Sequence, residues 1–240
     1  MERPSLTITL LYNNVAFDPS LETAWGFSAL VERNGETLLF DTGGDGSILT
    51  RNMTALEIDP ERIQSVILSH IHADHTGGLD ALLNTGIKPT VYIPPSFPSS
   101  FKNPVKQKTN LSEVEPGQSI AEGVITTGEM GTSIREQALI IRTTQGMVII
   151  TGCAHPGIVS MVDYAVQLVG DPVYLVIGGF HLGDAGRGRI TSILEDFRRM
   201  GVQKVAPSHC TGDVAIGMFR EEYGDDFVEA GVGSVIIVAP

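Results

Sequence analysis

Three histidines and an aspartate fall within six consecutive residues, directly after an apolar run. Side chains two residues apart in extended backbone point to the same face, so His70 and His72 face one way. Asp74 and His75 come at the turn that follows and can aim at a neighbouring point. Imidazole nitrogens and carboxylate oxygens are common ligands of divalent metals, so this segment predicts a site for one or two metal ions.

The other three histidines stand in a similar setting, just past apolar runs that predict strands. They are His155 in Thr-Gly-Cys-Ala-His, His181 in Gly-Gly-Phe-His and His209 in Pro-Ser-His-Cys. One such histidine is more often an ordinary surface or core residue, but six in one setting favour a metal centre at one edge of the predicted sheets. Asp41, after another predicted strand, either supports these histidines or bonds only the amides of its own turn.

Hydrophobic periodicity predicts the elements that must position these residues. Strands are predicted at residues 6–12, 27–32, 37–41, 63–68, 90–93, 124–127, 138–142, 147–151, 173–177, 202–206 and 235–238. Helices are predicted at residues 47–56, 78–84, 158–169, 190–200 and 212–222. Each half of the chain begins with predicted strands, and predicted helices occur between the later strands of that half. This order predicts the α/β class, as a four-layer αββα sandwich of two β-rich halves with helices outside.

Length and composition predict one compact domain over residues 1–240, with 18% charged and 42% hydrophobic residues. The net charge of −12 repels a polyanion, so we expect no nucleic-acid partner; a small anionic substrate can still be held by a local basic patch. No apolar run reaches membrane-spanning length, and residues 1–4 open without a signal-peptide core. We therefore expect a cytoplasmic protein without a membrane partner. The sequence leaves the oligomeric state open.

Local basic residues suggest where an anion would bind. Residues 94–118 lack periodicity and contain five prolines, and no acidic residue occurs between Asp80 and Glu113. The stretch is predicted to be either a lid that presents Lys102 and Lys106 to an anionic substrate or a solvated surface loop. Arg187, near the start of a predicted helix, either binds an anion or is simply exposed.

The two cysteines, Cys153 and Cys210, each lie close to a histidine in the chain. This placement argues against a disulfide framework and for thiols at or near the site.

The signature His70-x-His72-x-Asp74-His75, with Asp41 in Phe-Asp-Thr-Gly upstream and His209 downstream, resembles the metallo-β-lactamase fold. Other stretches resemble one branch of that fold: Trp-Gly-Phe-Ser, Thr-Gly-Gly-Leu, Thr-Gly-Cys-Ala-His-Pro-Gly, Gly-Gly-Phe-His-Leu and Ser-His-Cys-Thr-Gly. That branch contains the dihydropterin–ribofuranosylaminobenzene-phosphate synthases of methanopterin biosynthesis. In those synthases the site would help pyrophosphate to leave a pterin methyl carbon.

The resemblance implies that His70 and His72 bind one metal and that Asp74, His75 and His209 bind a second. It also implies a divalent metal cofactor, of which zinc is the leading candidate and iron or manganese are the alternatives.

The sequence departs from the commoner pattern of the fold in two places. No histidine occurs between His75 and His155, so the third ligand of the first metal is missing from its usual stretch. We expect His155 to supply this nitrogen. Cys153 stands where many members have a bridging aspartate, and it is either a ligand or a small buried residue behind the site.

The expected function is a metal-dependent hydrolase or transferase that acts on a small phosphorylated or pyrophosphorylated substrate, and the resemblance to the synthases implies that a pterin-like molecule is one candidate. A bound divalent metal lowers the pKa of water to about 7 and polarises a phosphoryl oxygen. Asp74 and His181 are the candidate catalytic residues: Asp74 can orient the water, and His181 can bind phosphate, donate a proton or join a metal.

A non-hydrolytic metal protein, a redox or sensing module, is the alternative. The flavodiiron proteins share a similar fold and a Pro-Ser-His stretch like the one at Pro207. Against this alternative, 240 residues leave no flavin-binding domain, and His72 stands where that group has a glutamate. A β-lactamase proper is not expected, because no export signal is present.

Overall fold

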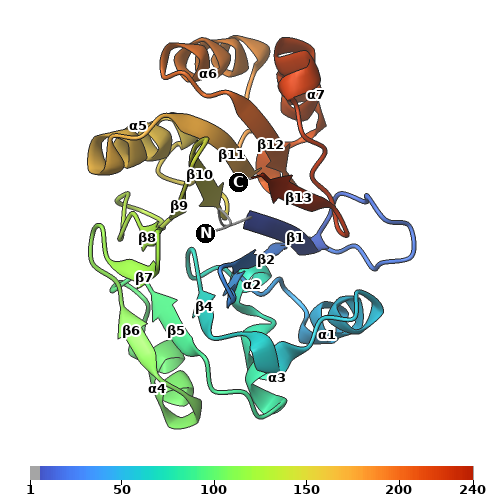
Figure 1. Cartoon of the computed structure of the whole chain (residues 1–240), viewed down its shortest axis with the longest axis vertical. Helices are drawn as coiled ribbons and strands as arrows, with labels where there is room; N and C mark the ends of the chain where they lie inside the picture. Colours follow the sequence, from blue (N-terminus) through green and yellow to red (C-terminus); the bar gives the residue numbers. More distant parts are fainter. Residues whose placement is uncertain (1–5, 240) are drawn as a thin grey trace. The chain divides into compact units, whose positions relative to one another are not determined.

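The computed structural model describes residues 6–239, and the chain divides into two compact units, each built on its own β-sheet (Figure 1). Unit 1 contains described residues 6–115 and 231–239, and unit 2 contains residues 116–230. The predicted start at residues 1–4 lies outside the described part of the chain.

The sheet of unit 1 has seven strands in the order β13-β1-β2-β3-β4-β5-β6. They are β1 (Leu6–Asn13), β2 (Phe27–Arg33), β3 (Glu36–Phe40), β4 (Ser65–Ile67), β5 (Thr90–Ile93), β6 (Leu111–Glu113) and β13 (Val235–Val238). The β2–β3 hairpin turns at Asn34 and Gly35, which have φ of 53° and 82°, the conformation that an Asn-Gly hairpin turn requires. From β3 to β6 the strands run parallel.

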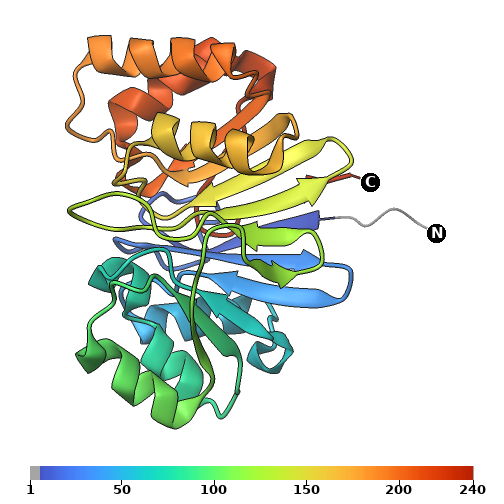
Figure 2. The ribbon, with the colours of Figure 1, turned by 90° about the vertical axis from the view of Figure 1, so that its left-hand side faces the viewer.

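Helices cover one face of this sheet (Figure 2). They are α1 (Gly46–Ala55), α2 (Ala73–Thr76), α3 (Leu79–Asn84) and α4 (Ser99–Lys108), with a 3-10 turn at Pro60–Arg62. The core of unit 1 forms where Leu49 and Met53 of α1 and Leu82 of α3 pack against Leu39 and Val66 of the sheet. All five side chains are buried, and their burial holds α1 and α3 on the sheet.

The sheet of unit 2 has six strands in the order β12-β11-β10-β9-β8-β7. They are β7 (Ser119–Ala121), β8 (Val124–Thr126), β9 (Leu139–Thr143), β10 (Gly146–Thr151), β11 (Val173–Gly179) and β12 (Lys204–Ser208). β7 to β10 pair antiparallel, whereas β10, β11 and β12 are parallel and are joined through α5 (Ile158–Val169) and α6 (Arg187–Arg199). The chain then forms α7 (Asp213–Tyr223), preceded by a 3-10 turn at His209–Thr211 and followed by one at Gly224–Asp226.

Helices α5, α6 and α7 lie on the same face of this sheet (Figure 2). Their apolar sides meet Ile149 and Val176 of the sheet in the core of unit 2, where Phe180, Phe197 and Phe219 are in contact, with ring centroids 5.4–5.8 Å apart. Aromatic pairs at this spacing contribute beyond the area that they bury.

The loop predicted over residues 94–118 is wrong in part, because Ser99–Lys108 forms α4 and Leu111–Glu113 forms β6. Pro104 lies inside α4 and cannot donate a backbone hydrogen bond there. Phe101 and Val105, four residues apart, pack on the core of unit 1, and this burial stabilises a helix that local propensity does not favour.

The predicted α/β class is confirmed, with two sheets that each carry helices. The single domain over residues 1–240 stays a prediction. No helix within residues 6–239 has both the length and the apolar character needed to cross a membrane.

Candidate metal centre

Parallel strands deliver the first site residues of unit 1 to the same end of its sheet. β3 ends at Phe40 and Asp41 follows at once, whereas its parallel neighbour β4 ends at Ile67 and leads into Ser69 and His70. Because carboxyl ends of parallel strands meet at one edge, a carboxylate and an imidazole that are far apart in the sequence become neighbours.

The short helix α2 presents the other members of the signature. His72 is its N-cap residue, and Asp74 and His75 lie in its single turn. The ring centroid of His70 lies 4.7 Å from that of His72 and 4.2 Å from that of His75. Unit 1 therefore brings these three imidazoles together, and Asp74 Oδ2 lies 3.5 Å from His75 Nε2.

Asp41 is fully buried, and its carboxylate makes hydrogen bonds with residues of the signature segment. Its carboxylate accepts the Ser69 N–H and O–H, each at 2.7 Å, and lies 2.7 Å from His75 Nδ1. The Ser69 hydroxyl lies 2.9 Å from His70 Nδ1. Of the two roles considered for Asp41, the one that these bonds favour is support of the histidines.

These bonds set the protonation of the buried pair. Burial raises the pKa of Asp41, while the charge and hydrogen bond of His75 and the bonds from Ser69 oppose that rise. Burial opposes protonation of His75, but the charge and hydrogen bond of Asp41, aided by Asp74, raise its pKa to about 10. His75 Nδ1 is therefore the ring atom that faces the carboxylate, and Nε2 is left for a metal.

In unit 2, three parallel strands each end close to a histidine. β10, β11 and β12 lead to His155, His181 and His209, which places the three at the same end of this sheet. His181 and His209 have positive φ, 53° and 52°, and Ala154 beside His155 has 61°. Such backbone is uncommon for residues with a side chain, and it turns the chain sharply at each strand end.

Glu136 is a fully buried carboxylate that no sequence pattern singles out. Its Oε1 accepts the N–H groups of Cys153 and Ala154, each at 2.8 Å. Its Oε2 accepts the N–H of His155 at 3.0 Å and lies 2.8 Å from His155 Nδ1. The only sequence signal is a lone carboxylate just before the apolar run of β9.

Both cysteines are buried thiols outside any disulfide, and both lie close to His181. One ligand atom each of Cys153, His181 and Cys210 lies within 4.8 Å of the others. A hydrogen bond with Cys153, opposed by burial, and a further one with His181 lower the pKa of Cys210 to about 5. The hydrogen bond with Cys210, opposed by burial, raises the pKa of His181.

The predicted substrate-binding lysines lie on α4. Lys102 Nζ is 3.0 Å from the Glu113 carboxylate and donates to the Pro95 carbonyl at 2.7 Å, so its charge is already paired within unit 1. Lys106 is exposed. Substrate binding by either lysine stays a prediction.

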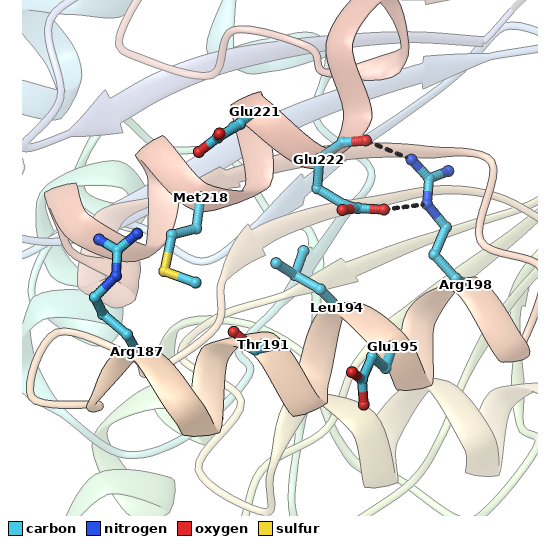
Figure 3. Close-up of a pocket in the computed structure, with 8 residues that line it drawn as sticks. All are labelled: Arg187, Thr191, Leu194, Glu195, Arg198, Met218, Glu221 and Glu222. Atoms are coloured by element: carbon cyan, nitrogen blue, oxygen red, sulfur yellow. Dashed lines mark hydrogen bonds and ion pairs between the residues drawn. The ribbon is translucent and has the colours of Figure 1, made fainter.

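Arg187 lies in a groove of about 540 Å³ between α6 and α7 of unit 2 (Figure 3). The same groove is lined by the carboxylates of Glu195, Glu221 and Glu222, and Arg198 donates to the Glu222 side chain at 3.0 Å. The three carboxylates make this groove a poor site for an anion. His155 and His181 line a separate cavity with Arg189.

The donors in each unit suit a divalent metal. Where Nδ1 of a histidine is held by a carboxylate or hydroxyl, the ring coordinates through Nε2, and this arrangement fixes both tautomer and orientation. His70, His75 and His155 are all held in this way. Nitrogen and oxygen donors of this kind accept zinc, iron or manganese, so the donor set does not select one metal.

Comparison with known proteins identifies the same family that the His70–His75 signature resembles. The sequence pattern of the metallo-beta-lactamase superfamily matches residues 26–209. A 7,8-dihydropterin-6-methyl-4-(beta-D-ribofuranosyl)-aminobenzene-5'-phosphate synthase of Methanocaldococcus jannaschii is 33% identical over 278 aligned positions, covering 95% of each chain. An uncharacterized protein of the same organism, MJ0448, is 27% identical over 95% of this chain and 99% of its own.

A solved structure resembles the whole chain. It is that of Tm1679, a metal-dependent hydrolase of the beta-lactamase superfamily, which is 25% identical with a TM-score of 0.84 and covers 98% of this chain and 100% of its own. Sequence pattern, relatives and solved fold all agree with the resemblance inferred from the His70–His75 signature. The chain belongs to the metallo-β-lactamase superfamily.

Proposed function

We propose that this chain is a metal-dependent hydrolase or transferase that acts on a small phosphorylated or pyrophosphorylated substrate of the pterin class. Superfamily membership and the synthase relative support the coarser statement, a metal-dependent enzyme with a small substrate. The observation that carries the proposal is that a carboxylate or hydroxyl lies within hydrogen-bond distance of Nδ1 in three histidines, which leaves Nε2 of each ring for a metal. The pairs are His70 with Ser69, His75 with Asp41, and His155 with Glu136.

The proposed ligands follow the superfamily assignment. His70 and His72 hold one ion, with His155 as the additional nitrogen. A second ion takes Asp74, His75 and His209. Support for these assignments comes from the donor chemistry within each unit and from the shared signature.

When bound, a divalent ion supplies Lewis-acid activation of a phosphoryl oxygen and a water with a pKa of about 7. Residues of the chain would orient the water and supply the proton. Asp74, whose side chain is 21% exposed, can accept a hydrogen bond from the attacking water and aim it at the substrate. His181, whose pKa is raised by Cys210, can donate a proton to the oxygen that leaves.

A pyrophosphorylated dihydropterin tests the reaction type directly. In hydrolysis, the bond between the pterin methyl carbon and the pyrophosphate oxygen breaks, and water supplies the new oxygen. In transfer, the same bond breaks and the carbon bonds to the amino nitrogen of a ribofuranosylaminobenzene phosphate acceptor, which loses a proton, so pyrophosphate release depends on the acceptor. An artificial phosphodiester, assayed with and without chelator, provides a broader test of hydrolysis.

The protein should be purified without added metal and its metal content measured by elemental analysis. We expect a divalent metal, turnover that is lost with a chelator, and loss of both metal and turnover in His72→Ala while the circular dichroism spectrum is kept. Turnover that persists after complete metal removal would overturn the proposal. Iron with a visible absorption band and no turnover would instead favour a redox module.

A further inference from the structure

A cavity of about 310 Å³ in unit 2 is lined by histidines of the candidate metal centre and by residues of the first turns of α5 and α6. His155 and His181 line it beyond the ends of β10 and β11, and Arg189 lines it from the first turn of α6. The volume is at the lower end of the range for small-molecule sites. The ring centroids of His155 and His181 lie 4.5 Å apart, with the ring planes tilted by 47°.

Arg189 differs from most arginines of this chain. Seven others each pair with a carboxylate: Arg51, Arg62, Arg135, Arg142, Arg198, Arg199 and Arg220. Within residues 6–239, no ion pair involves Arg189. In a protein of net charge −12, an uncompensated guanidinium beside two imidazoles makes a local positive site.

The rest of the lining suits an anion with an organic body. No Asp or Glu of the described chain lines this cavity. α5 begins here with Gly157 as its N-cap residue, no side chain caps its first turn, and no acidic residue occurs in that turn. Its first amide N–H groups add to the positive potential. Phe180, Ile158 and Ile193 supply apolar walls.

We propose that this cavity binds the phosphoryl or pyrophosphoryl group of the substrate, with Arg189 as its principal charged ligand and His181 as a second donor. The planar guanidinium donates two parallel N–H bonds to phosphate oxygens, while the apolar walls contact the organic part. This inference rests on the proposed function for the identity of the substrate, but the anion site can be measured without turnover.

Arg187 provides a matched control. It lies two residues before Arg189 on the same helix, carries the same charge, and lines the separate groove with three carboxylates (Figure 3). An effect that depends on the overall charge of α6 would be the same in Arg187→Ala and Arg189→Ala. An effect of the cavity would appear only in Arg189→Ala.

The experiment is calorimetric titration of inorganic pyrophosphate, and separately of phosphate, into the purified metal-containing protein. Metal content is measured for each variant. We expect wild type and Arg187→Ala to bind pyrophosphate with similar affinity, and Arg189→Ala to bind it at least about tenfold more weakly with unchanged metal content. Arg189→Lys should recover part of the loss, because it restores charge without the bidentate fork.

Three outcomes would overturn the inference: no pyrophosphate binding to the wild type at millimolar concentration, equal weakening by the two alanine variants, or wild-type affinity in Arg189→Ala. The last would mean that the anion is held elsewhere, for instance on the metal. If no phosphorylated compound is turned over but Arg189-dependent pyrophosphate binding is found, the proposed function fails while the anion site stands.

Discussion

Glu136 and His155 form a buried pair in which Oε2 lies 2.8 Å from Nδ1, although 19 positions separate the two residues in the sequence. The same carboxylate also accepts three backbone N–H groups of the following loop. It thus holds both the side chain and the backbone of a proposed metal ligand.

Glu136→Gln should destabilise the protein and weaken its metal binding. The amide NH₂ would face backbone donors, and leaving buried polar groups unsatisfied costs about 1–3 kcal/mol. The misoriented His155 should lower metal affinity by about 10–100-fold. Chemical unfolding and a metal-competition assay check both effects. Glu22→Gln, which breaks an exposed pair with Arg51, is the control and should change neither; wild-type metal affinity in Glu136→Gln would contradict the positioning role.

Asp41→Asn should change the proton balance of metal binding. In the metal-free protein, Asp41 helps to raise the pKa of His75 to about 10, so His75 is protonated at pH 8 and must lose about one proton when its Nε2 binds metal. Without the Asp41 carboxylate, the effect of burial on the pKa of His75 is opposed by Asp74 alone, so this pKa falls and fewer protons are released on metal binding. Calorimetry in buffers of different ionisation enthalpy measures the release. The same proton release in both proteins would contradict this coupling.

Cys210→Ser should be more destabilising at high pH than at low pH. A thiol whose pKa falls from 9.0 to about 5 on folding stabilises the folded state fully above pH 9, and this contribution is lost as the pH falls towards 5. Urea unfolding of both proteins at pH 8 and pH 5.5, under reducing conditions and at matched metal content, gives the difference. A cost that does not vary with pH would show that the thiolate contributes nothing.

Gly179→Ala should reduce the free energy of unfolding by about 1–3 kcal/mol through overpacking. A Cβ at Gly179 would lie 2.3 Å from the Gly152 carbonyl oxygen and 2.7 Å from Cys210 Sγ, and the backbone oxygen cannot move aside cheaply. Gly188→Ala is the control, because a Cβ there meets nothing within 4 Å and alanine favours the helix by about 0.4–1 kcal/mol. Thermal unfolding should shift in opposite directions for the two variants.

Local patterns predicted much of the fold. The Asn34–Gly35 turn fixed the β2–β3 hairpin, and periodicity placed α5 at Ile158–Val169 with the predicted bounds, because each depends on neighbouring residues alone. α4 was missed because Pro104 opposes a helix and only packing on the core of unit 1 compensates for it.

The candidate site was predictable only where its chemistry lies in consecutive residues. The signature His70–His75 is visible in the sequence, and each later histidine follows a strand. The supporting bonds are not visible, since Asp41 meets His75 across 34 positions and Glu136 meets His155 across 19. Such pairs depend on strand order and register, which one sequence does not reveal.

The clamp that Glu136 makes on Cys153, Ala154 and His155 also bears on the order of folding. These three amides are bonded to a side chain that precedes β9, and not to a neighbouring strand. The native order of this loop therefore depends on one carboxylate, and we expect the loop to open more readily than the sheet beside it. We expect the proposed His155 ligand geometry to be lost when the bonds to this carboxylate open locally, separately from global unfolding.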